Sequence, residues 1–139
     1  RTFSVENTEK VKQYSTQLLE SIAAAHGLEV EINFLPSTKV LMNDANAISR
    51  VEHVIDEAFG PGRYWNMPDP IAGGEDFASV VDLIPGAFVF MGACPDGMDP
   101  NKASTNHSNK ALFDDSVLAD GAALLASLAF DALNEAAAR

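Results

Sequence analysis

The chain has 139 residues, of which 47% are hydrophobic, enough for one ordinary domain or two small pieces with a packed core. Twenty acidic residues against nine basic ones give a net charge of -11, which disfavours nucleic acid and anionic membranes as partners. No apolar run approaches the roughly 20 residues that a membrane-spanning helix needs, and the chain does not open with a signal peptide. Because Cys94 is the single cysteine, no internal disulfide can form, and the reducing cytoplasm is the expected compartment.

An amphipathic helix is predicted between Ser4 and His26-Gly27. Ser4, with Glu6 and Glu9 close behind it, is typical of a helix start, because acidic side chains favour the positive end of the helix dipole. The pair His26-Gly27 is typical of a helix end. The apolar residues recur every three or four positions and predict one buried stripe. They are Val11, Tyr14, Leu18, Leu19, Ile22 and Ala25.

A strand is predicted to follow over residues 28–35, where apolar and polar residues alternate with the period of a half-buried strand. Pro36 is expected to end it. Thr2-Phe3 is predicted to be the end of another strand. Residues 1–36 are therefore expected to form a strand end, a helix and a strand on a one-faced sheet.

The rest of the chain is predicted to contain three helices and one strand. A helix capped by Asn43 or Asp44 is expected to stop at Gly60-Pro61-Gly62, and a short helix is expected from Glu75 to about Leu83. The apolar run over residues 87–92 suits a strand covered on both faces. The last helix is predicted over residues 115–138. Its expected core face consists of Val117, Leu118, Ala122, Leu125, Leu128, Ala129 and Leu133.

Two polar segments carry the candidate chemistry: Gly73-Gly74-Glu75-Asp76-Phe77 and Asn106-His107-Ser108. Adjacent glycines let a backbone approach a ligand closely, because no Cβ stands in the way. Carboxylates follow them at once, and imidazole is the commonest protein ligand for zinc-like metals. The grouping predicts a metal-assisted hydrolase site that is incomplete within these residues.

Four segments in register resemble a known family. They are Arg1-Thr2-Phe3, the Gly-Gly-Glu-Asp-Phe turn, Pro85-Gly86-Ala87-Phe88 leading to Met91-Gly92, and His107 before Phe113-Asp114-Asp115. Their order and spacing are similar to those of the metal-dependent amidohydrolases of the aminoacylase, hippurate hydrolase and auxin-conjugate hydrolase type. The similarity extends over nearly the whole chain.

The resemblance implies an α/β fold, in which a sheet flanked by helices binds two divalent metals and an inserted α+β lid domain mediates dimerisation. Residues 1–38 would be the last part of the lid, and residues 39–139 the last part of the catalytic domain. The first half, with most metal ligands and the glutamate used as general base, would lie upstream of Arg1. No second histidine of similar context is present in the chain.

By the same resemblance, His107 is the metal ligand of this chain, and Gly73, Gly74 and Glu75 line the substrate site. Exposed amides of the glycine turn would hold a substrate carboxylate or an oxyanion. A plainer role for Glu75 and Asp76 is that of acidic residues in the first turn of a short helix. No catalytic residue is assigned within the chain.

Other polar residues have plainer interpretations. Asp114 and Asp115 could support a metal ligand, but capping of the last helix is the simpler role. Cys94 is expected to be a buried inert thiol. His26 is expected at a helix end and His53 on a helix flank.

The expected function of the parent protein is hydrolysis of the amide bond of an N-acyl amino acid or a short peptide. The metals would be zinc or manganese, with cobalt or nickel also suited to imidazole and carboxylate ligands. The chain alone would be inactive, and a homodimer is expected. The alternatives are a non-catalytic structural or dimerisation module and an unrelated small α/β binding module.

Overall fold

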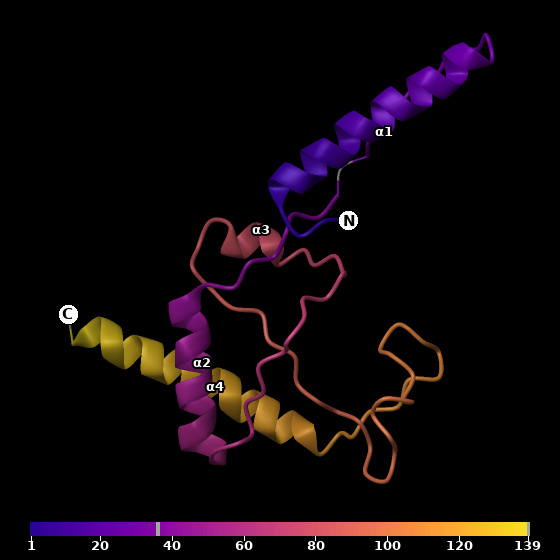
Figure 1. Cartoon of the computed structure of the whole chain (residues 1–139). Helices are drawn as coiled ribbons and strands as arrows, with labels where there is room; N and C mark the ends of the chain where they lie inside the picture. The colour runs from indigo at the N-terminus through magenta and orange to yellow at the C-terminus, as the bar shows by residue number, and fades with distance from the viewer. Residues whose placement is uncertain (36, 139) are drawn as a thin grey trace. The chain divides into compact units, whose positions relative to one another are not determined.

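A computed structural model describes residues 1–35 and 37–138 and contains four helices in this part of the chain (Figure 1). They are α1 (Val5–Ala25), α2 (Ala45–Phe59), α3 (Ala78–Val81) and α4 (Val117–Ala137). The chain divides into two compact units. Unit 1 comprises Arg1–Asp44 and Asn66–Ala87, and unit 2 comprises Ala45–Trp65 and Phe88–Arg139.

The expected α/β fold is wrong, because none of the described residues is in a strand. Residues 28–35 and 87–92 are not helical, but no neighbouring segment forms a hydrogen-bonded ladder with them in the described parts of the chain. The same holds for Thr2-Phe3. A strand exists only when a second strand takes up its backbone N–H and C=O groups. The predicted end of the strand at Pro36 lies outside the described residues.

The helix ends follow the predicted signals. The Ser4 hydroxyl accepts a hydrogen bond from the Asn7 N–H at 3.1 Å, which caps the start of α1. Gly27 has a φ of 66°, so the chain leaves α1 through a left-handed residue that glycine adopts without strain. Gly60, with a φ of 87°, ends α2 in the same way.

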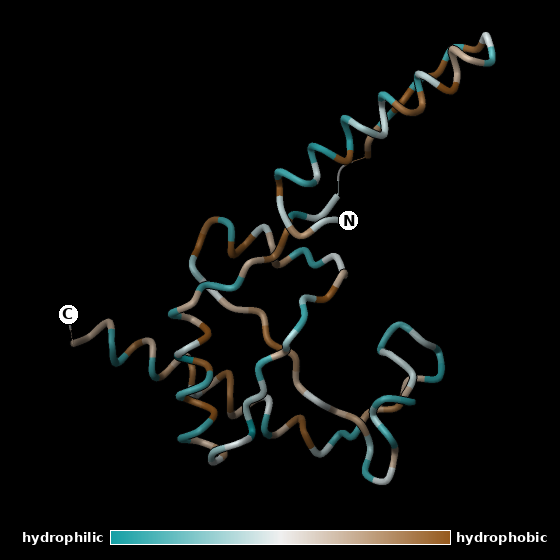
Figure 2. The backbone as a smooth tube through the Cα atoms, viewed as in Figure 1, coloured by the Kyte–Doolittle hydropathy of each residue, from teal (hydrophilic) through white to brown (hydrophobic). Residues whose placement is uncertain are grey.

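In unit 1 the start of α1, residues 37–44 and α3 pack together. Ala78 is its most buried residue, with 1% of its surface exposed. The Lys39 ammonium pairs with the Asp82 carboxylate, and the Asp44 N–H donates to the Gly86 carbonyl at 2.9 Å. The predicted buried stripe of α1 is wrong, since no residue of this helix is buried. Figure 2 shows hydrophilic and hydrophobic residues alternating along α1.

Unit 2 is organised around the contact between α2 and α4, which lie against each other (Figure 1). Val51 and Val54 of α2 are buried, with 6% and 4% of their surface exposed. Arg50 pairs with Asp131 at 3.0 Å and also with Glu135, both on α4. Charged side chains therefore join the two helices around a small apolar centre.

The predicted core face of α4 is wrong at three of its four leucines, whereas Leu128 is half-buried. Leu118, Leu125 and Leu133 are 66%, 71% and 69% exposed. The side of α4 that meets α2 instead carries Asp131 and Glu135, because the arginine on α2 needs carboxylate partners. An apolar pattern shows which residues favour burial but does not show which neighbour is present to bury them.

The length and composition of α4 differ from the expectation that no apolar run approaches a membrane span. By these two criteria alone, its 21 residues could cross a membrane. In the structure α4 instead lies against α2 and bears three ion-paired carboxylates, on Asp120, Asp131 and Glu135. We therefore treat it as a helix of unit 2.

Candidate functional site

The glycine turn lies in unit 1, immediately before α3. Gly73 and Gly74 do not have positive φ angles, so neither position needs the conformational freedom of glycine. One oxygen of the Glu75 carboxylate accepts a hydrogen bond from the Phe77 N–H at 3.1 Å. Glu75 therefore holds the turn that leads into α3, which agrees with the plainer of its two predicted roles.

Close contacts explain why residue 74 has no side chain. A Cβ placed on Gly74 would overlap the Arg1 guanidinium and lie 2.7 Å from the Thr38 hydroxyl. A Cβ on Gly73 would meet only Ile71, at an ordinary 3.5 Å. Arg1 and Thr38 are thus neighbours of the glycine turn that sequence reasoning did not assign to the site. No local motif connects them, because the three residues are distant in the sequence.

His107 lies in unit 2, in an exposed loop. The Ser108 N–H donates to the Thr105 carbonyl at 2.9 Å, and the Ala111 N–H donates to the Ser108 carbonyl at 3.1 Å. These bonds shape the loop without using the imidazole. Within the described residues, no hydrogen bond or ion pair engages the His107 ring, and the residue is exposed.

Asp114 supports the start of α4. One of its carboxylate oxygens accepts a hydrogen bond from the Ser116 N–H at 2.9 Å. Hydrogen bonds from the Ser116 side chain and backbone hold the pKa of Asp114 below its ordinary value. The Asp114 N–H in turn donates to the Ala93 carbonyl at 2.9 Å. These contacts favour the capping role of Asp114 over the support of a metal ligand.

The residues of this chain do not assemble a metal site on their own. Among the described residues, no group of three His, Cys, Asp or Glu side chains gathers closely enough to hold a metal ion. A zinc site normally has at least three protein ligands. Cys94 is only partly buried, and its sulfur lies 3.7 Å from the Met98 carbonyl oxygen. His53 lies 3.6 Å from Glu57 on the exposed side of α2.

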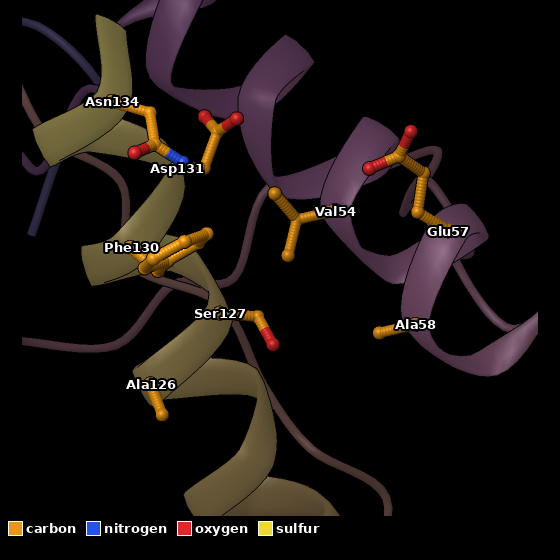
Figure 3. Close-up of a pocket in the computed structure, with 8 residues that line it drawn as sticks. All are labelled: Val54, Glu57, Ala58, Ala126, Ser127, Phe130, Asp131 and Asn134. Carbon is orange, nitrogen blue, oxygen red and sulfur yellow. The ribbon is translucent and has the colours of Figure 1, made fainter.

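A pocket with a volume of about 580 Å³ lies between α2 and α4 (Figure 3). Its lining combines Val54 and Phe130 with Ser127 and Asn134. Asp131 also lines it but already pairs with Arg50. None of the predicted site residues belongs to this pocket, so it is a gap in helix packing rather than the candidate site.

The second pocket lies in unit 1, beside α3, and has a volume of about 350 Å³. Its lining is mainly apolar and comes from the start of α1, from residues 40–42 and from α3. Unit 1 therefore contains both the glycine turn and a pocket large enough for a small organic group.

Comparison with known proteins places the chain in a hydrolase family. The family model described as peptidase family M20/M25/M40 matches residues 4–131. The chain belongs to this family, which confirms the resemblance seen in its motifs. No solved structure matches it significantly.

Curated relatives give the same assignment. Over 92 residues the chain is 32% identical to an N-acetylcysteine deacetylase of Bacillus subtilis, a stretch of 66% of this chain and 23% of that protein. Over 134 residues it is 25% identical to the IAA-amino acid hydrolase ILR1-like 2 of Arabidopsis thaliana, covering 94% of this chain and 30% of that protein. The chain thus spans less than a third of the length of these relatives.

Proposed function

We propose that the protein containing this chain hydrolyses the amide bond of N-acyl amino acids or short peptides. The observation that carries the proposal is the family match over residues 4–131. The names of the relatives support the substrate class, since N-acetylcysteine is an N-acyl amino acid and the Arabidopsis protein is named for an IAA-amino acid.

The glycine turn is proposed to bind the substrate carboxylate. Gly73, Gly74 and Glu75 would line the site. The Arg1 guanidinium at Gly74 supports this role, because guanidinium groups recognise carboxylates through paired hydrogen bonds. The Thr38 hydroxyl adds a neutral donor at the same place.

His107 is proposed to be a ligand for one of two divalent metals, zinc or manganese, with cobalt or nickel also suitable. An exposed imidazole without a protein partner among the described residues suits this role. The remaining ligands and the general base would lie outside these 139 residues, because no cluster of metal-ligating side chains occurs in the described part of the chain. We also propose a cytoplasmic homodimer without nucleic-acid or membrane partners, and the exposed apolar stripe of α1 supports self-association.

The second candidate function is that of a non-catalytic piece, and the isolated His107 favours it for this polypeptide alone. The 139-residue chain is expected not to hydrolyse N-benzoylglycine or N-acetyl amino acids, even with added zinc or manganese. The longer protein is expected to hydrolyse them and to stop when a chelator is added. Turnover by the short chain would refute the inactive-piece proposal, whereas failure of the longer protein on every N-acyl amino acid would refute the function.

Gly74→Ala is expected to reduce turnover of the longer protein on the order of 10–100-fold, because the new Cβ displaces Arg1 and Thr38. Its stability should fall by about 1–3 kcal/mol, the usual cost of overpacking, and no strain from a positive φ adds to this. Gly92→Ala is the control and should leave the rate unchanged, because a Cβ at residue 92 meets no atom within 4 Å. Kinetics and thermal melting of both variants decide the matter. A lower melting temperature with an unchanged rate would make residue 74 purely structural.

A further inference from the structure

The apolar pocket of unit 1 has no role in the proposed function so far. Its apolar lining comes from three segments: Phe3 and Val5, Val40 and Met42, and Ala78 and Val81. Two polar residues, Ser4 and Asp82, complete the lining. The Ser4 hydroxyl already caps α1, and the Asp82 carboxylate already pairs with Lys39. Nothing in the lining therefore requires a charged or strongly polar occupant.

The same three segments also form the surroundings of Gly74. Arg1 precedes Phe3 by two residues, Thr38 precedes Val40 by two, and Gly74 precedes Ala78 by four. Two residues span at most about 7 Å. The Arg1 guanidinium and the Thr38 hydroxyl thus belong to residues that are each two positions along the chain from residues lining the apolar pocket. A molecule with a carboxylate at one end and an apolar group close by is complementary to both.

We propose that this pocket is the specificity pocket for the apolar group of an N-acyl amino acid whose carboxylate lies at Gly74. The inference rests on the proposed function, because the carboxylate position comes from it. Size agrees with an aromatic or branched group, since an apolar cavity of about 150 Å³ already accommodates benzene. The pocket, at about 350 Å³, holds a benzoyl ring or a phenylalanine side chain.

Direct binding to the 139-residue chain tests the pocket without requiring hydrolysis. Two probes place the aromatic ring at opposite ends of the amide, namely N-benzoylglycine and N-acetylphenylalanine. Saturation-transfer NMR followed by titration gives the dissociation constant of each, with N-acetylglycine as the ligand that lacks a ring. We expect the ring-bearing probes to bind more tightly than N-acetylglycine. The tighter of the two shows whether the pocket selects the acyl group or the amino-acid side chain.

Val81 and Val80 provide a matched pair of variants, because both belong to α3 but only Val81 lines the pocket. Val81→Phe fills the cavity and is expected to weaken the tighter probe by about tenfold or more, through lost apolar burial. Val80→Phe should change its affinity by no more than about twofold. Circular dichroism checks that each variant keeps its helices. If Val81→Phe unfolds, Val81→Ala widens the cavity and should shift preference from N-benzoylglycine toward N-(2-naphthoyl)glycine.

The outcomes separate this inference from the proposed function. The proposal that the pocket binds an apolar group would be overturned by either of two results. The ring-bearing probes could bind no better than N-acetylglycine, or the variants at residues 80 and 81 could have equal effects. Such a result would leave hydrolysis by the longer protein untouched. Conversely, tight and Val81-dependent binding would uphold the pocket even if the longer protein hydrolysed no N-acyl amino acid. In that case the proposed function alone would fail.

Discussion

Replacing His107 with alanine in the longer protein is expected to lower hydrolysis of N-acyl amino acids by more than about 100-fold. Residues that merely support a metal ligand already cost 10–100-fold when removed, so loss of a ligand itself should cost more. The metal content should fall by one ion per site, while the far-ultraviolet circular dichroism should be unchanged. The fold should survive because His107 is exposed and its loop is held by backbone hydrogen bonds at neighbouring residues.

His53→Ala is the control for this experiment. His53 is an exposed histidine on α2 whose ring lies 3.6 Å from Glu57, so its loss removes an imidazole without touching the His107 loop. Activity and metal content of this variant should match those of the unmodified protein. If His107→Ala also retains full metal and a near-normal rate, the loop histidine is not a ligand.

Replacing Val54 with aspartate is expected to destabilise unit 2 by about 3 kcal/mol or more. Val54 is 4% exposed on the side of α2 that faces α4, so a carboxylate there would be buried without a partner. Urea unfolding of the 139-residue chain, followed by circular dichroism, measures the loss in the free energy of unfolding. Val54→Ala should cost less, because it removes methyl groups without burying a charge.

His53→Asp is the matched control, since residue 53 neighbours Val54 along α2 but has an exposed side chain. We expect it to change the free energy of unfolding by no more than about 0.5 kcal/mol. If aspartate at residues 53 and 54 costs the same, Val54 is not part of a packed contact between α2 and α4.

The helices could be predicted from the sequence because their signals are local. The Ser4 cap, the left-handed Gly27 and the glycine after α2 each act within one helical turn. The strands could not be predicted in the same way. Alternation of apolar and polar residues over 28–35 indicates which face of a strand would be buried. A sheet also needs a second strand that forms hydrogen bonds with the first, and none of the described segments supplies one. The division between a lid part (residues 1–38) and a catalytic part (residues 39–139) stays a prediction.

The candidate site was only partly accessible to sequence reasoning. Gly73, Gly74 and His107 stand out because their residue types and motifs are distinctive. The approach of Arg1 and Thr38 to Gly74 depends on the fold of unit 1, and no short-range pattern encodes it. Adjacent glycines at residues 73 and 74 predict that the backbone approaches a ligand closely, and that stays a prediction. The structure shows that the Arg1 and Thr38 side chains approach Gly74 closely and that its φ angle is not positive.

The ion pairs that join α4 to Arg50 and Arg63 also limit how far α4 can slide along α2. Asp120 pairs with Arg63 at 3.3 Å, and Asp131, eleven residues further along α4, pairs with Arg50 at 3.0 Å. Eleven helical residues span about 16 Å. If α4 slid along α2 by one turn, about 5.4 Å, Arg63 would lose Asp120. Arg50 would keep a carboxylate partner for a slide in one direction, because Glu135 lies about one turn beyond Asp131 on α4. The Arg63–Asp120 pair therefore fixes the alignment of α4 more strictly than the two pairs at Arg50.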